Sequence, residues 1–69
     1  MKITYDSDAD AMYIYLDEEA EIDRTKEVDK DVIIDYDKKG NVIGIEFLFV
    51  KEKRPELLKQ IKVENLIAA

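Results

Sequence analysis

Three aspartates at alternate positions near the start of the chain have the spacing that best fits a known binding chemistry. Asp6, Asp8 and Asp10 match the first three ligands of a calcium-binding loop, and Asp17 stands at the twelfth position. The match fails at the sixth position, where such a loop needs glycine for a sharp turn and this chain has Ala11. We therefore interpret the segment as a solvated acidic turn. The alternative hypothesis is a calcium-like divalent-metal site made of Asp6, Asp8, Asp10 and Asp17.

A second group of carboxylates would suit acid–base chemistry if two of them came within a few ångströms of each other. Asp35 and Asp37 lie on one face of a predicted strand, and Glu46 on its partner strand is expected near Asp35. Acids at such positions also end strands, cap turns and prevent edge pairing. The sequence favours the structural interpretation of these acids. An enzyme that uses Asp35 and Glu46 is kept as a third hypothesis, after a protein-interaction module and a metal-binding domain.

Other catalytic chemistries lack their usual residues. The chain has no histidine and no cysteine, which removes the commonest general base and thiolate metal sites. Besides the tyrosines, the hydroxyl groups are those of Thr4, Ser7 and Thr25, and none has a histidine to activate it. Gly40 and Gly44 do not form the glycine-rich loop that precedes a phosphate-binding helix. The sequence predicts a non-enzyme without catalytic residues and without a cofactor.

The charge of the chain argues against nucleic acid as a partner. The net charge is −6, with 13 acids and 4 bases in residues 1–37 and 4 acids and 7 bases in residues 38–69. Nucleic-acid affinity comes largely from phosphate contacts made by Lys and Arg, so an acidic chain is poorly suited to it. The uneven charge suits a basic or amphipathic protein partner, or head-to-tail charge matching between subunits. The simpler interpretation, which the sequence favours, is that the acidic charge serves solubility alone.

The length of the chain predicts a single domain over residues 1–69. A chain of 69 residues buries only about 60% of its unfolded surface, so its core needs reinforcement. Because cysteine is absent, oligomerisation is the favoured reinforcement. No apolar stretch approaches the roughly 20 residues of a membrane-spanning helix, and no signal peptide is evident. We expect a cytoplasmic protein that does not bind membranes.

The predicted sheet is organised around a hairpin in residues 32–50, where two apolar runs flank a turn with Gly40 at its positive-φ position. A first hairpin is expected from residues 3–6 and 11–16, whereas residues 24–28 give only a weak extended pattern. The last strand is apolar on both faces, so we expect it to be central and covered twice. Gly44 in its middle indicates a bulge or the close approach of another side chain.

A C-terminal helix is predicted after Pro55, with an apolar stripe at Leu57, Leu58 and Ile61. One helix covers only one sheet face, so a second copy of the chain is the simplest cover for the other. The predicted fold is α+β: an antiparallel β-meander of about four strands with one C-terminal helix packed on the sheet. Residues 1–50 form the sheet region and residues 51–69 the helical segment.

The chain contains, in this order, the short motifs Tyr5-Asp6, Ala9-Asp10-Ala11, Glu27-Val28-Asp29, Asp35-Tyr36-Asp37 and Gly44-Ile45-Glu46. Together they resemble a family of proteins known only as a domain of unknown function, DUF2283. The resemblance covers about residues 2–50, and Ser7 stands where many members carry proline. It implies a compact, mostly antiparallel β domain of cytoplasmic bacteria or archaea, with no assigned activity, cofactor or catalytic residue. It also implies an antitoxin-like role, because some members neighbour toxin-type partners.

The leading functional hypothesis is a small cytoplasmic protein-interaction module, antitoxin-like and without catalytic activity. Its partners are expected to be a second copy of the chain and a protein encoded nearby, and neither nucleic acid nor a membrane. The alternative is the carboxylate-based metal-binding domain.

Overall fold

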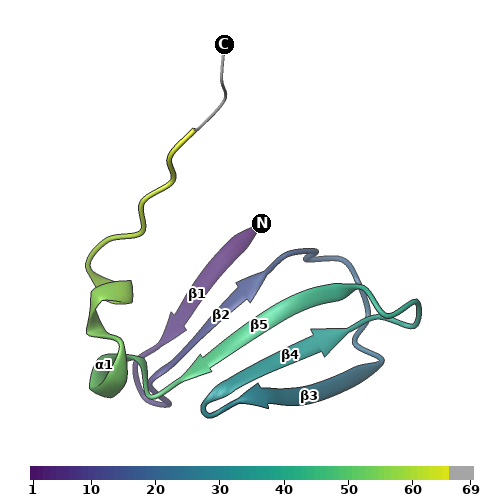
Figure 1. Cartoon of the computed structure of the whole chain (residues 1–69), viewed down its shortest axis with the longest axis horizontal. Coiled ribbons are helices and arrows are strands. Elements are labelled where there is room, and N and C mark those ends of the chain that lie inside the picture. Colours follow the sequence, from purple (N-terminus) through teal and green to yellow (C-terminus); the bar gives the residue numbers. More distant parts are fainter. Residues whose placement is uncertain (66–69) are drawn as a thin grey trace.

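The computed structural model describes residues 1–65 and contains one antiparallel sheet of five strands (Figure 1). The spatial order is β1-β2-β5-β4-β3. No helix within these residues is long and apolar enough to cross a bilayer. The strands are β1 (Lys2–Asp6), β2 (Ala11–Tyr15), β3 (Arg24–Asp29), β4 (Val32–Tyr36) and β5 (Val42–Leu48).

Two features of the predicted sheet are corrected. The predicted four strands undercount the sheet, because β3 is an additional edge strand. All six of its residues are exposed, so it carries no alternation of buried apolar residues that would identify it. The order is also not a meander, because β5 enters between β2 and β4 and pairs with both. The central position predicted for the last strand is confirmed, and it explains why β5 is apolar on both faces.

The register divides the sheet into two faces of different character. The first, which we call the apolar face, consists of two cross-strand rows. They are Ile3–Ile14–Ile45–Ile34 and Tyr5–Met12–Phe47–Val32. The second, which we call the polar face, contains the rows Thr4–Tyr13–Glu46–Ile33–Glu27 and Lys2–Tyr15–Gly44–Asp35–Thr25. Because side chains alternate along a strand, the apolar and polar sets cannot mix without a shift of register.

The hairpin turn between β4 and β5 uses Gly40 as predicted. Gly40 has φ of 84°, and its amide donates a hydrogen bond to the carbonyl oxygen of Asp37 at 3.1 Å. A Cβ at this position would meet no heavy atom within 4 Å, so a substitution there changes the backbone energy alone.

Gly40→Ala is expected to lower the free energy of unfolding by about 1 kcal/mol, because L-residues with a Cβ disfavour positive φ. Gly40→Asn is the matched control, and it should lose less because asparagine tolerates this conformation. Urea unfolding of both variants provides the measurement. Equal losses for the two variants would contradict the assignment of the effect to backbone strain.

The helical part of the chain is shorter than predicted. It consists of α1 (Val50–Lys53) and a 3-10 turn, η1 (Pro55–Leu58), which has Pro55 in its first turn. Residues 59–65 form no further helix, and the predicted continuation over residues 66–69 lies outside the described residues. Both helical turns stand at the end of the strands rather than across a sheet face (Figure 1). The fold remains α+β in the broad sense, but the predicted packing of a long helix over the sheet is wrong.

A buried junction fixes α1 to the sheet. Val50 is completely buried, and its amide donates to the carbonyl oxygen of Asp10 at 3.1 Å. The Lys51 amide donates to the side chain of the same aspartate at 2.7 Å. Phe49, just before the helix, has φ of 55°, and this left-handed residue turns the chain sharply from β5 into α1. The C-terminal turns therefore start from a fixed point beside the β1–β2 turn.

Candidate functional site

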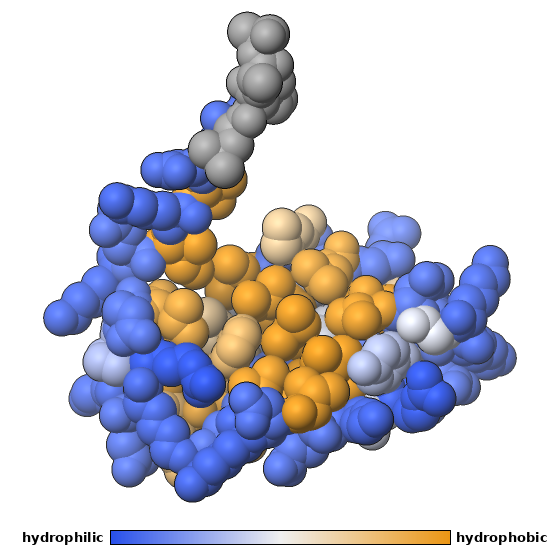
Figure 2. All heavy atoms as spheres, viewed as in Figure 1, coloured by the Kyte–Doolittle hydropathy of each residue, from blue (hydrophilic) through white to orange (hydrophobic). Residues whose placement is uncertain are grey.

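The apolar face is the most extensive candidate site. Figure 2 shows apolar side chains gathered over the middle of the sheet, with hydrophilic residues around them. In residues 1–65 no helix or strand crosses this face, and the sheet forms a single layer (Figure 1). Met12 is only 3% exposed and Ile43 5%, whereas Ile3 is 43% exposed and the rest of the isoleucine row is half-buried. The side chains thus cover one another partly, and a wide apolar surface remains in contact with solvent.

Such a surface is energetically unfavourable for an isolated domain. An amphipathic sheet becomes stable by burying its apolar face against a second layer. Each half-exposed isoleucine that is fully buried contributes about 1 kcal/mol, since complete burial of such a side chain is worth about 1.5–3 kcal/mol. A surface of this kind in a soluble protein is typical of an interaction site.

A basic cluster lies at the α1 end of the apolar face. Lys53 pairs with Asp31, and its ammonium also lies 5.3 Å from the ring centre of Phe49. The guanidinium carbon of Arg54 lies 5.6 Å from the ring centre of Phe47, a residue of the apolar face. Both distances suit cation–π attraction. The positive charges therefore border the apolar surface directly.

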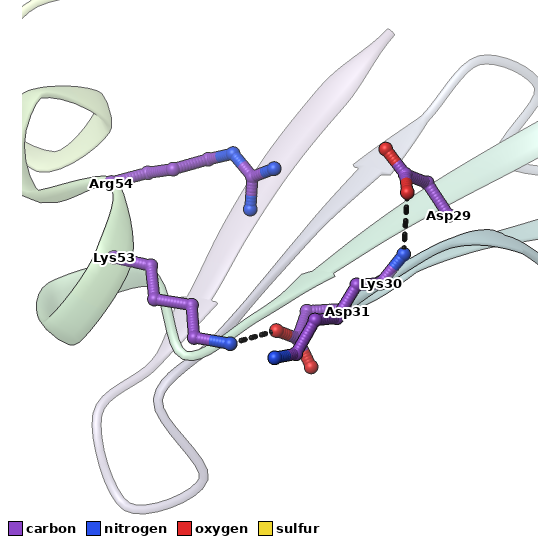
Figure 3. A pocket seen from close by; sticks show the side chains of 5 residues that line it. All are labelled: Asp29, Lys30, Asp31, Lys53 and Arg54. Carbon is purple, nitrogen blue, oxygen red and sulfur yellow. Dashed lines mark hydrogen bonds and ion pairs between the residues drawn. The ribbon is translucent and has the colours of Figure 1, made fainter.

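These basic residues form one wall of a shallow pocket of about 260 Å³ (Figure 3). The opposite wall is the β3–β4 turn, where the amide of Lys30 donates to the side chain of Asp29 at 2.8 Å. Asp31 in this turn has φ of 62°. Arg54 makes no ion pair within residues 1–65, so its guanidinium is available for an acidic group. The pocket is lined by Asp29, Lys30, Asp31, Lys53 and Arg54.

The other end of the strands carries an acidic loop, which we define as residues 17–23. Five of its seven residues are acids, and the acids are exposed. The loop joins β2 to β3 at the end of the sheet opposite α1 (Figure 1). In the described chain its one ion pair joins Glu18 to Lys2 at 3.6 Å, and both side chains are about half exposed. A second pocket, of about 370 Å³, lies between this loop and the β4–β5 turn. The loop is therefore strongly acidic, whereas the α1 end of the apolar face carries acids and bases together.

A hydrogen-bonded cluster holds the polar face together. The Tyr13 hydroxyl donates to one carboxylate oxygen of Asp35, and the Thr25 hydroxyl donates to the other. Asp35 is only 7% exposed, so these two bonds satisfy a buried charge. The Tyr13 ring lies over Gly44, where a Cβ would be 2.5 Å from ring atom Cζ and 2.7 Å from Cε1. The close approach predicted from a glycine in mid-strand is confirmed, and the approaching side chain is Tyr13.

Burial raises the pKa of the Tyr13 phenol, and the bond to Asp35 raises it further. A raised pKa in the folded state means that this contribution to stability is complete below pH 10, the unfolded value, and is lost as the pH rises above it. The free energy of unfolding is therefore expected to fall as the pH rises above about 10, and to fall less steeply in Tyr13→Phe. Urea unfolding across this range provides the measurement. Parallel slopes for the two proteins would show that Tyr13 does not cause the effect.

The structure does not bring together the four aspartates of the alternative, metal-binding hypothesis as a ligand set. Asp6 accepts from the amides of Asp8 and Ala9 and caps the β1–β2 turn. Asp10, in the same turn, accepts from the Tyr5 hydroxyl at 2.7 Å and from the Lys51 amide, and the bond from Lys51 is the main cause of its lowered pKa. Asp17 lies at the opposite end of β2 and accepts from the Glu19 amide. Among the described residues no group of three or more acids is placed to hold a metal ion.

The carboxylates of the third hypothesis also serve separate structural roles. Asp35 stands opposite Gly44, whereas Glu46 stands opposite Ile33, and no hydrogen bond joins the two carboxylates in the described structure. Asp37 caps the β4–β5 turn and accepts from the side chain of Asn41 at 3.0 Å, which is the main cause of its lowered pKa. Neither pocket includes Asp35 or Glu46.

Sequence reasoning missed two residues of functional interest. In the sequence, Arg54 is one of several bases in a charged run. Only its position beside Phe47 in the structure distinguishes it from the other bases of that run. Tyr13 is one of four tyrosines in the sequence, and only the glycine in mid-strand indicated that some side chain approaches there.

Comparison with known proteins gives one match. A family model described as "Protein of unknown function (DUF2283)" matches residues 2–51, which include all five strands. Neither a curated protein nor a solved structure matches the chain.

Proposed function

Since the chain belongs to the DUF2283 family, whose function is unknown, we propose from the geometry that it is a small protein-interaction module that forms a homodimer through its apolar face. The observation that carries the proposal is the uncovered apolar face of a single-layer sheet (Figure 2). Two such sheets packed face to face form the two-layer arrangement in which antiparallel sheets are stable.

The size of the surface supports a second copy as the occupant. A stable protein–protein interface buries about 800 Å² on each partner. This is about one seventh of the 5621 Å² surface of the chain, a share that suits one face of a five-stranded sheet. A face-to-face dimer buries identical apolar rows against each other and leaves the polar faces outside.

The outer surface of such a dimer supports a further partner of opposite charge. The polar face carries Glu27 and Glu46, and the chain as a whole has a net charge of −6. We propose an antitoxin-like role in the cytoplasm of a prokaryote, in which the dimer binds a basic protein encoded nearby. Co-purification of the tagged native protein with that neighbour is the expected result. A neighbour that does not bind would remove this part of the proposal.

Sedimentation equilibrium tests the homodimer directly. At micromolar concentrations the expected mass is twice the 8.1 kDa of the chain, and it should fall towards that of the monomer on dilution. A monomer at all concentrations up to the millimolar range would overturn the proposal.

A further inference from the structure

We infer that the two copies pack with their strands running in opposite directions, so that the acidic loop of each copy lies against Arg54 of the other. This arrangement rests on the proposed homodimer. The pocket beside Arg54 contains Asp29 and Asp31, of which Asp31 is paired with Lys53 (Figure 3). In the inferred arrangement the partner's residues 17–23 bring carboxylates to Arg54 itself.

Arg54 is one half of the inferred contact between the two copies. Its guanidinium lies beside Phe47 at the margin of the apolar face, and the residue is half-buried even in one copy. A second sheet on this face removes more water from the guanidinium. A charge that loses water needs a hydrogen-bonded partner of opposite charge. Lys53 already has such a partner in Asp31, whereas Arg54 has none within residues 1–65.

The acidic loop is the other half of the inferred contact. Its acids include Asp17, Glu19 and Glu21, which make no ion pair in the part of the chain described. The loop and α1 lie at opposite ends of the same sheet (Figure 1). Arg54 directly follows α1, so it cannot meet the loop within one chain. A twofold axis across the strands places the loop of one copy over the α1 end of the other. Carboxylates then reach the guanidinium, whose planar fork binds a carboxylate with two parallel hydrogen bonds.

The alternative orientation is electrostatically unfavourable. A twofold axis along the strands would place the two acidic loops at the same end, five acids against five. It would also place the two Arg54 side chains at the same end, without a loop carboxylate for either. Like charges placed opposite each other across an interface disfavour the complex. The turns beside α1 also carry acids, namely Asp6, Asp8, Asp10, Asp29 and Asp31. Asp31 is paired with Lys53, and Asp6, Asp10 and Asp29 accept from backbone amides.

Charge reversal tests the orientation. In the antiparallel dimer, Arg54→Glu alone and the pair Glu19→Lys with Glu21→Lys alone should each raise the dimer dissociation constant about tenfold or more, because each replaces two attractive contacts by repulsive ones. Combining all three substitutions in one chain exchanges the charge at position 54 with the charges at positions 19 and 21, so that these side chains attract again. The dissociation constant should then return to within about threefold of the native value. Lys59→Glu, an equal change of charge at an exposed position near Arg54, is the control and should have little effect.

The outcomes separate the orientation from the dimer itself. Sedimentation of each variant gives the dissociation constant, and circular dichroism checks the fold. A native dimer whose dissociation constant does not rise with Arg54→Glu, or falls with the loop reversal, overturns the antiparallel arrangement. In along-strand packing Arg54→Glu exchanges one like pair for another, and the loop reversal relieves the repulsion between the two acidic loops. Weakening by each reversal without recovery in the combined variant also overturns the antiparallel arrangement. A native chain that stays monomeric overturns the proposed function instead.

Discussion

Ile34→Glu is expected to convert the dimer into a folded monomer. Ile34 lies in the isoleucine row of the apolar face, between Ile45 on β5 and Lys26 on β3. In one chain the new carboxylate lies beside Lys26 and reaches water, so the monomer tolerates it. In the dimer two carboxylates would be buried and two isoleucines lost. Together these changes weaken association by about 3 kcal/mol or more, which is at least a hundredfold in the dissociation constant.

Ile33→Lys is the matched control for this prediction. Ile33 is the preceding residue of β4, is half-buried like Ile34, and points to the polar face between Glu46 and Glu27. Its new charge also gains opposite charges as neighbours, and it should leave the dimer intact. Sedimentation equilibrium measures both variants. Equal weakening by both substitutions would mean that the apolar face is not the specific interface.

Gly44→Ala is expected to destabilise the monomer by about 2–4 kcal/mol. The added methyl group would overlap the Tyr13 ring, at 2.5 Å from Cζ, so the ring must move. Overpacking of this kind costs about 1–3 kcal/mol, and loss of a hydrogen bond to a buried charge costs about 1.5–3 kcal/mol. The small gain from replacing glycine in a strand offsets part of the loss. For a chain of 69 residues this is a large share of a total stability of roughly 3–10 kcal/mol.

A double-mutant cycle with Tyr13→Val isolates the cause. Removing the ring frees the space over Gly44, so Gly44→Ala should cost less than 0.5 kcal/mol in that background, on the order of a surface change. Urea unfolding of the four proteins gives the coupling energy, which should be about 2 kcal/mol or more. An unchanged cost of Gly44→Ala without the ring would show that another contact is responsible.

Local patterns in the sequence predicted much of the sheet. In the first predicted hairpin, alternation at every second residue places Met12 and Ile14 on one face and Tyr13 on the other, and the register agrees. Gly40 indicated the turn because few other residues adopt positive φ. The apolar character of both faces of the last strand predicted its central position. These features depend on neighbours within a few residues along the chain, so a single sequence is enough to determine them.

Strand order, partners of individual side chains and the extent of the helix were decided by the tertiary structure. β3 is a strand because it pairs with β4 at an edge, and its exposed, mostly charged residues carry no apolar alternation. The pattern after Pro55 suits a helix, but no sheet face lies beneath it to stabilise one, and only short turns form. Asp6, Asp10 and Asp17 read as one ligand set, yet β2 separates Asp17 from the others.

By itself, then, the sequence determined which residues share a face and where the hairpins turn, because these follow from the two-residue period of a strand and from the φ preferences of single residues. Only the fold decided that Tyr13 covers Gly44 and that Arg54 borders the apolar face at the end opposite the acidic loop. Those placements join segments far apart in the chain. They arise from the pairing of whole strands, which no local pattern specifies.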